Sequence, residues 1–426
     1  MLRFLKHLSL YTIVGFLNPA INFFLTPLLS HYLLPADYGL LALFNSYITL
    51  LIPLISIVAY ALLSIEYYKE KDANTYASKF VSIQIIPVVN FIWMAILGWS
   101  LFYQYSDAIE LRNVDRIWII VILLVSFSTV YVDTLFTFLI IKRRVVLYTI
   151  YSVLRALLET GITIWLIVYK GYGWEGRILS AFIISLLFLV LAILYFRRQG
   201  YLRGEIRWDY IKAGIIYGSP LILHAVGKVV MNQSDRLFIT KLRDIEVAGI
   251  YSVGYTVGSV ILILVNVFNN LLTPYVYERL ANLTEKAKIQ LVKASYLFGA
   301  ATLVILLLLI PVSKLLFSQF IDPKYIEGSR YVFWIGLSYF FWGCYLLFSG
   351  YIFYYNKTKL LAQLSIVSIG CNILFNYLFI SKVGAIGAAY STALSFLIVF
   401  IIVAIKANKL VALPWFKRHT FSIRNI

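Results

Sequence analysis

ILSAFIISLLFLVLAILYF, residues 178–196, is an uninterrupted run of uncharged and mostly apolar side chains that ends at Arg197 and Arg198. The hydrocarbon core of a bilayer is about 30 Å thick, and a helix needs about 20 residues to cross it. A strand of a membrane barrel would instead alternate apolar and polar residues over about ten positions. Because backbone groups in lipid must be paired within the segment, this run predicts a transmembrane helix.

Similar runs recur along almost the whole chain. Of its 426 residues, 62% are hydrophobic and only 13% are charged, and the mean hydropathy is +0.86. The short connections between the runs leave no room for a soluble domain of about 100 residues. The sequence therefore predicts an all-α integral membrane protein with about twelve transmembrane helices. The expected spans are approximately 8–30, 39–65, 80–103, 116–140, 146–169, 177–196, 212–234, 247–274, 290–315, 330–353, 360–380 and 384–405.

The distribution of basic residues predicts the orientation of the chain. About 24 of the 37 Lys and Arg residues fall in the two chain ends and in the alternate connections on the same side, against about 10 in the other connections. Because loops rich in Lys and Arg stay in the cytoplasm, both termini are expected to be cytoplasmic. A net charge of +18 distributed in this way does not require a nucleic-acid partner.

Short matches indicate that the second half of the chain repeats the first. A shift of 210 residues places Tyr38–Leu40 on Ala248–Ile250. A shift of 211 places Gly173–Gly176 on Gly384–Gly387, and the same shift places Ser180 on Ser391. Two distant regions that share nearly one offset favour an internal duplication.

The repeat predicts the architecture. Six helices return the chain to the side from which it started, so the two halves have the same orientation in the membrane. The expected bundles are residues 1–208 and 209–426, around a central cavity. Parallel repeats of this kind are typical of transporters that rock two bundles around a site near the bilayer midplane.

Four short motifs resemble a known family. Leu34–Gly39 looks like the Pro-x-x-Tyr-Gly turn of polysaccharide-unit flippases, and Ser234–Arg236 with Val247–Ser252 is similar to the seventh and eighth helices of that family. Gly384–Ala389 resembles the opening of its last helix. The family is the O-antigen flippase group (Wzx-type) of the multidrug/oligosaccharidyl-lipid/polysaccharide exporter superfamily.

The resemblance implies a function. Such a protein moves an undecaprenyl-diphosphate-linked oligosaccharide, an O-antigen unit or a similar polysaccharide repeat, from the cytoplasmic to the periplasmic leaflet of a bacterial inner membrane. Alternating access is the implied mechanism, with ion coupling as the expected driving force. Glycosyltransferases and a polysaccharide polymerase of the same pathway are the implied partners, besides the lipid bilayer and the lipid-linked cargo.

Ionisable residues inside the spans are the candidate functional groups, because each costs about 2.5–3.5 kcal/mol in lipid unless it has a polar partner or a wet cavity. At 100° per residue, His224, Lys228 and Asp235 share one narrow face of the span 212–234 and its end. Arg155 and Glu159 lie one turn apart in the span 146–169. Arg155 and Lys228 would replace the lost hydration of an anionic diphosphate.

Each of these assignments has a structural alternative. Arg155 and Glu159 could simply neutralise each other along one helical turn. Asp235 could form an interfacial pair with the adjacent Arg236, and His224 could serve as an ordinary packed histidine rather than a proton carrier.

Three further polar residues complete the predicted site. Asp133, in the span 116–140, is expected either to couple transport to an ion or to make a hydrogen-bonded helix contact. Asn18 and Asn22, in the first span, are expected to line the cavity with neutral polar groups.

The sequence favours transport over catalysis. There is no Walker loop, no histidine pair spaced for a metal, and no catalytic constellation, so no cofactor and no metal site are expected. The closest alternative is a multidrug or cation exporter of the same superfamily, which would be expected to centre on acids rather than on Arg155 and Lys228. A peptidoglycan-precursor flippase and a membrane-embedded polysaccharide polymerase are further alternatives.

Overall fold

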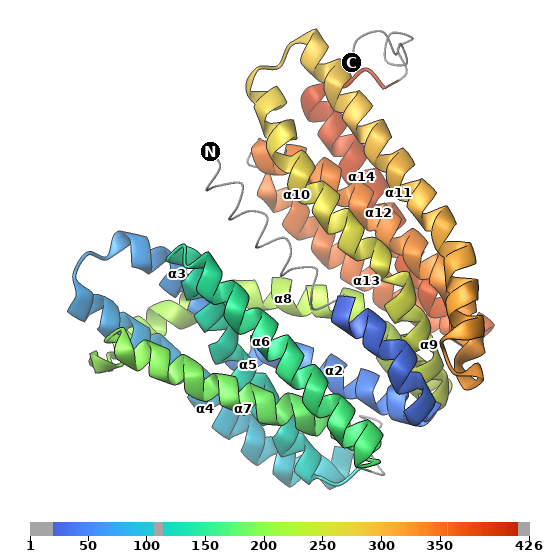
Figure 1. The fold of residues 1–426 in the computed structure, drawn as a ribbon. Helices are drawn as coiled ribbons and strands as arrows, with labels where there is room; N and C mark the ends of the chain where they lie inside the picture. The colour runs from blue at the N-terminus through green and yellow to red at the C-terminus, as the bar shows by residue number, and fades with distance from the viewer. Residues whose placement is uncertain (1–19, 106–113, 356, 416–426) are drawn as a thin grey trace. The chain divides into compact units, whose positions relative to one another are not determined.

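A computed structural model describes residues 20–105, 114–355 and 357–415. Within these ranges the chain is almost entirely helical and contains no strand (Figure 1). Residues 20–32 are helical, but most of the expected first span and the predicted site residue Asn18 lie outside the described ranges.

The described helices lie where the spans were expected, except that the expected spans 39–65 and 247–274 are each divided into two helical segments. Eleven of them, some made of two consecutive segments, are long and apolar enough to cross a membrane within the described residues. The prediction of an all-α multi-pass membrane protein is therefore confirmed. In chain order the elements are α2 (Pro35–Ser56), α3 (Tyr60–Lys69), α4 (Ala73–Tyr105), α5 (Ile117–Ile141), α6 (Val145–Ile164), a π-helical turn (Trp165–Tyr169), α7 (Trp174–Arg198), a 3-10 turn (Tyr201–Arg203), α8 (Trp208–Leu242), α9 (Ile245–Gly258), α10 (Val260–Ala281), α11 (Glu285–Gln319), a 3-10 turn (Pro323–Gly328), α12 (Ser329–Tyr354), α13 (Thr358–Val383) and α14 (Ile386–Val411).

The first compact unit contains Tyr32–Gln233. Its central helix is α5, which packs against α2, α4, α6 and α7. The core at one end is aromatic: the Phe80 and Phe138 rings lie edge to face at 5.5 Å, and Phe196 and Tyr201 pack around them. Aromatic pairs of this geometry add about 0.5–1.5 kcal/mol beyond the area that they bury.

The second compact unit contains Asn22–His31 and the chain from Ser234 onward. Its central helix is α12, which packs against α9, α10, α11 and α14. The segment 22–31 joins this unit because the backbone N–H of Asp322 donates to Ser30 Oγ at 3.0 Å and the His31 ring lies 3.5 Å from the Asp322 carboxylate.

The two compact units differ from the expected division at residues 208 and 209. Residues 209–233 of α8 belong to the first unit, because Ile211 and Ile215 pack against its core and Gly214 lies against Ile83. The expected division at residues 208 and 209 separates the two sequence repeats, whereas the compact units are separated by packing. The repeat boundary therefore stays a prediction.

The repeat itself is visible in the packing. If the helical residues 20–32 are counted as the first membrane segment, the central helix α5 is the fourth segment of the first half. The central helix α12 is likewise the fourth segment of the second half, which begins with α8. Ser180 and Ser391, the pair matched by sequence, each bond to the preceding long helix: Ser180 Oγ lies 2.6 Å from Thr163 Oγ1, and Ser391 Oγ donates to the Asn372 carbonyl at 3.2 Å. Two repeated helical bundles are thus confirmed, whereas the cavity expected between them stays a prediction.

The expected span 39–65 is broken in the structure. Pro53 removes a backbone donor from α2, and Ile57 and Val58 then adopt left-handed φ values of 50° and 54° before α3 begins. The Asn90 amide caps the freed Ile55 carbonyl at 3.0 Å. A discontinuous helix at membrane depth is tolerated because its carbonyls find partners inside the protein.

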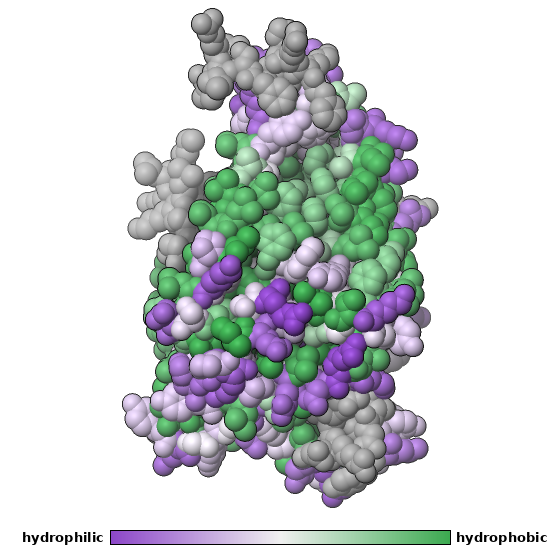
Figure 2. Space-filling view, turned by 90° about the vertical axis from the view of Figure 1, so that its right-hand side faces the viewer, coloured by the Kyte–Doolittle hydropathy of each residue, from purple (hydrophilic) through white to green (hydrophobic). Residues whose placement is uncertain are grey.

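The helices present apolar surfaces outward, as a protein in lipid must. On α11, Leu297, Val304, Leu308 and Leu315 are each more than half exposed, and they recur on one face of the helix. Figure 2 shows one side of the molecule, where a wide apolar expanse is visible in the upper half, above a lower half in which apolar and hydrophilic residues are mixed. A surface of this extent would promote aggregation in water, but it suits contact with lipid chains.

Candidate functional site

Arg155 faces an acid on another helix. Asp133 on α5 is partly buried and lies within electrostatic range of Arg155 on α6, and also of Tyr60 and Tyr148. Arg155 has no carboxylate within 4 Å among the described residues, so the two charges attract each other without forming a contact pair. This arrangement leaves the guanidinium of Arg155 with donors that are available to a ligand.

Glu159 pairs with an arginine that sequence spacing does not indicate. Its carboxylate lies 3.3 Å from Arg177 Nη2 on α7, and Arg177 Nη1 donates to Thr163 Oγ1 at 2.9 Å. The alternative in which Arg155 and Glu159 neutralise each other is not what the structure shows. The Glu159–Arg177 ion pair links α6 to α7, which indicates a structural role for Glu159.

Asp235 is the centre of a buried polar cluster in the second unit. Its carboxylate accepts from Arg236 Nη1 at 3.0 Å and from the Tyr251 hydroxyl at 2.6 Å. The guanidinium of Arg236 lies over the Tyr255 ring at 3.8 Å, and the Tyr255 and Tyr339 hydroxyls are hydrogen bonded to each other. Every charged group in this cluster has a partner, which supports the structural alternative for Asp235.

A neutral polar group lies next to this cluster. Ser234 Oγ donates to Asn372 Oδ1 at 2.9 Å, and Asn376 Nδ2 donates to Ser234 Oγ at 3.1 Å. Asn372 and Asn376 are fully buried on α13. Nothing in the sequence distinguishes these asparagines, because an uncharged amide within a span is not as costly in lipid as an ionised group.

The two other residues of the predicted α8 face are exposed. His224 and Lys228 lie in the part of α8 that belongs to the first unit, whereas the buried Asp235 belongs to the second. That the three residues act on one site stays a prediction. Lys228 has no carboxylate within 4 Å in the described part of the chain. Asn22 is exposed, and its carbonyl accepts from Thr26.

A groove in the first unit extends this α8 face. Its volume is about 770 Å³. Tyr217, two turns before His224, lines it together with residues of α3, α4 and α8, namely Leu62, Glu66, Lys79, Ile83, Tyr210, Ala213 and Ile216. A groove that combines the Tyr210 and Tyr217 rings with the Glu66 carboxylate offers the flat apolar surfaces and hydrogen-bond acceptors that a sugar needs.

Lys79, which lines this groove, is paired with two carboxylates, those of Glu66 in the groove and of Glu70 next to it. Lys79 Nζ lies 2.6 Å from Glu66 Oε2 and 2.9 Å from Glu70 Oε2. The hydrogen bond that Lys79 donates lowers the pKa of the Glu70 carboxyl. Two carboxylates on one ammonium leave acceptor capacity for hydroxyl groups of a ligand.

Comparison with known proteins assigns the chain to a family. The family model described as "Polysaccharide biosynthesis protein" matches residues 4–280, about two thirds of the sequence. The chain belongs to the polysaccharide biosynthesis protein family. A second model, MatE, matches residues 220–378. The resemblance drawn from the four sequence motifs is thereby confirmed.

Two curated relatives from Haemophilus influenzae match part of this family member. "Lsg locus putative protein 1" is 28% identical over 217 residues, which cover 47% of the chain and 50% of the relative. An "uncharacterized membrane protein" is 25% identical over 236 residues, which cover 53% and 57%. The matched region therefore spans about half the length of these relatives.

Solved structures share the fold of this polysaccharide biosynthesis protein. An inward-facing multidrug resistance MATE family transporter of the MOP superfamily has a TM-score of 0.70 at 13% identity, covering 94% of this chain and 98% of the other. The lipid II flippase MurJ, in an inward closed conformation, has a TM-score of 0.74 at 13% identity, covering 94% and 87%. At this identity the likeness establishes the fold alone.

Proposed function

We propose that this polysaccharide biosynthesis protein is a flippase for polyprenyl-diphosphate-linked oligosaccharides. Its cargo would be an undecaprenyl-diphosphate-linked O-antigen unit or a similar repeat, carried from the cytoplasmic to the periplasmic leaflet of a bacterial inner membrane by alternating access. Both termini would then be cytoplasmic, and the polymerase and glycosyltransferases of the pathway would act next to it.

The proposal depends mainly on the environment of Lys228. It lies near the middle of the 35-residue helix α8, it is exposed, and it has no carboxylate within 4 Å among the described residues. An ammonium at that depth is too costly to face hydrocarbon, so it must face water or an anionic ligand. A diphosphate supplies that anion, and Arg155 supplies a second cation in the same unit.

The internal pairing narrows the candidates for ion coupling. Glu159 and Asp235 are already matched by Arg177 and Arg236, which favours structural roles for both. Asp133 and His224 have no such contact pair in the described chain, so they remain the groups that we propose for coupling.

The proposal is tested in cells that lack the protein. Loss of surface polysaccharide, with the diphosphate-linked oligosaccharide trapped on the cytoplasmic leaflet, is expected. Wild type should restore export, Lys228→Ala should reduce it at least tenfold, and Lys228→Arg should retain most of it because the positive charge is kept. Lys212→Ala, an exposed lysine at the start of the same helix, is the matched control and should transport normally.

Two outcomes would favour other functions. The MATE fold makes a drug or cation exporter the second candidate, and normal polymer with altered drug resistance would support it. Single units that reach the periplasm without being joined would instead indicate a polymerase.

A further inference from the structure

Three helices of the first unit build the groove of about 770 Å³, and each contributes side chains from one face. Leu62 and Glu66 lie one turn apart on α3, and Lys79 and Ile83 lie one turn apart on α4. The other lining residues come from α8, namely Tyr210, Ala213, Ile216 and Tyr217. The volume falls within the range of about 300–1,000 Å³ that small-molecule sites have.

Close packing of α8 fixes one wall of this groove. An added methyl group at Gly214 would lie 3.2 Å from Ile83 and from Ile86, so α8 lies directly against α4 at this point. At 100° per residue, Tyr210 and Tyr217 lie within about 20° of each other around α8. Both rings are therefore carried on one face of a helix that the neighbouring packing holds in place.

The polar residues of the groove include one acceptor and one donor that the protein leaves unused. Glu66 Oε2 accepts from Lys79, whereas Glu66 Oε1 makes no hydrogen bond with the described residues. Both oxygens of Glu70 are engaged, one by Lys79 and the other by the backbone N–H of Asp72 at 3.2 Å. Lys79 has three N–H donors and uses two of them for these carboxylates. Glu66 Oε1 and the remaining Lys79 donor are thus a neighbouring acceptor and donor.

Tyr217 supplies an aromatic surface next to these groups. It is 37% exposed, and no hydrogen bond or ring contact engages it within the described residues. Tyr210 differs, because the guanidinium of Arg207 lies 5.0 Å from the centre of its ring. The Tyr217 ring presents a flat apolar face, against which the C–H groups of a sugar ring can pack.

The charge of the groove distinguishes between classes of sugar. The carboxylates of Glu66 and Glu70 surround the single ammonium of Lys79, so the three groups carry one net negative charge. A hydroxyl both donates and accepts, so neighbouring sugar hydroxyls match Glu66 Oε1 and the free Lys79 N–H. The carboxylate of an acidic sugar would instead be repelled by the net negative charge, and the ammonium that could attract it is already paired twice.

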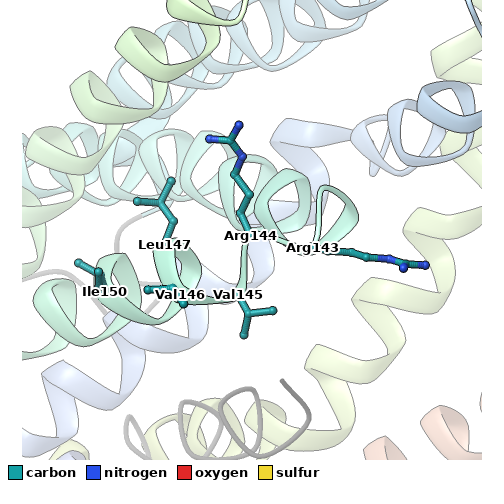
Figure 3. A pocket seen from close by; sticks show the side chains of 6 residues that line it. All are labelled: Arg143, Arg144, Val145, Val146, Leu147 and Ile150. Carbon is teal, nitrogen blue, oxygen red and sulfur yellow. The ribbon is translucent and has the colours of Figure 1, made fainter. Parts of the chain in front are cut away.

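A second hollow in the first unit lacks this combination of groups. It lies at the turn between α5 and α6 and has a volume of about 370 Å³. Figure 3 shows that its two cations, Arg143 and Arg144, extend in different directions, so they do not converge on one ligand. Its other lining residues are apolar, namely Val145, Val146, Leu147 and Ile150. The groove between α3, α4 and α8, by contrast, brings a free ring, an acceptor and a donor to one place.

We propose that this groove is a subsite for an uncharged sugar ring, and that Glu66 is the residue that discriminates against acidic sugars. The sugar packs on Tyr217, and its hydroxyls donate to Glu66 Oε1 and accept from Lys79. The inference rests on the proposed function in one respect, because it takes this ring to be part of the oligosaccharide cargo. It goes further by assigning where the saccharide is recognised and which charge class of sugar is accepted.

The test measures binding of methyl β-D-glucopyranoside to the purified full-length protein by saturation-transfer NMR, in a detergent without a sugar headgroup. Wild type should bind this glucoside saturably. The corresponding methyl glucuronide, whose carboxylate is ionised at pH 7, should bind at least tenfold more weakly. Methyl glucuronamide has a similar shape without the charge and should bind within threefold of the glucoside. Absence of glucoside binding, or equal binding of the glucuronide, would overturn the proposal.

Variants show whether the glucoside binds in the groove. Glu66→Ala and Tyr217→Ala should each weaken glucoside binding at least fivefold, whereas Tyr217→Phe should stay within twofold of wild type because the ring remains. The matched controls are Glu70→Gln and Trp208→Ala, which alter an acid and an aromatic residue that do not line the groove. Both controls should bind the glucoside within twofold of wild type. Equal losses in the controls and in the groove variants would contradict the proposal.

Two further measurements separate this inference from folding and from transport. If Glu66→Ala does not fold, as judged by its unfolding temperature, Glu66→Gln removes the charge and keeps the shape. The preference for glucoside over glucuronide should then fall from at least tenfold to less than threefold, and an unchanged preference would contradict the role of Glu66. Normal polysaccharide export in cells by a protein that binds no glucoside would overturn this inference and leave the proposed function intact.

Discussion

At the scale of residues, the charged groups inside the spans divide into those that the protein matches and those that it leaves for a ligand. Asp235 with Arg236 and Glu159 with Arg177 are matched across short distances. Lys228 is not, within the described chain. Sequence position alone does not make this distinction, because the Glu159 partner comes from another helix.

The buried Asp235 cluster should contribute to stability. Asp235→Asn leaves Arg236 without its counter-charge and weakens the bond from Tyr251, and breaking one partner of a buried pair costs about 3–5 kcal/mol. Unfolding of the purified protein in detergent should show a loss of this size. The control Asp209→Asn alters an acid that is 80% exposed and should cost less than about 1 kcal/mol.

The outcome also separates the two interpretations of Asp235. A variant as stable as wild type that has lost transport would contradict the structural role and would indicate an ion-coupling group. A destabilised variant whose remaining folded fraction still transports would support the structural role.

At the scale of elements, the positions of the spans could be predicted and their breaks could not. Uninterrupted apolar runs locate the helices, because burial in lipid depends on composition over about 20 residues. The break after α2 depends on tertiary contacts, in which Asn90 donates to the Ile55 carbonyl and Gly218 lies against the Ile57 carbonyl. Pro53 weakens α2 by removing one backbone donor, but it does not locate the break. Ile57 and Val58 adopt left-handed backbone without a glycine in the sequence that would mark the position.

Gly218 on α8 permits the close packing at this break. A methyl group added there would lie 2.0 Å from the Ile57 carbonyl oxygen. Because the contact is with backbone, Gly218→Ala must displace α8 from α2, and overpacking of this kind typically costs about 1–3 kcal/mol. Thermal unfolding in detergent should show a lower midpoint.

Gly161→Ala is the matched control, because Gly161 lies in helix α6 of the same unit and an added methyl group meets nothing within 4 Å. This change should be neutral or stabilising by up to about 1 kcal/mol, from the higher helix propensity of alanine. Equal midpoints for the two variants would show that α8 does not pack on the break as described.

At the scale of the whole molecule, the duplication could be inferred from short matches, and the structure explains why so little of it survives in sequence. Ser180 and Ser391 are retained as helix contacts, whereas the polar clusters of the two units use different residues. Packing of apolar faces tolerates many substitutions, so the fold persists after most identities are lost. The site was only partly predictable, because the groups that pair across helices are distant in sequence.

If the protein is a flippase, it moves a diphosphate-linked lipid from one leaflet to the other. Reconstitution of the purified protein in vesicles measures this movement directly. The purified protein is placed in vesicles with a fluorescent polyprenyl-diphosphate oligosaccharide in both leaflets, and an impermeant glycosidase is added outside. We predict that, with wild-type protein, the glycosidase cleaves nearly all of the labelled lipid. Lys228→Ala should slow cleavage of the lipid that starts in the inner leaflet at least tenfold, whereas Lys212→Ala should not. Cleavage that stops at the outer half, as in protein-free vesicles, would contradict the account.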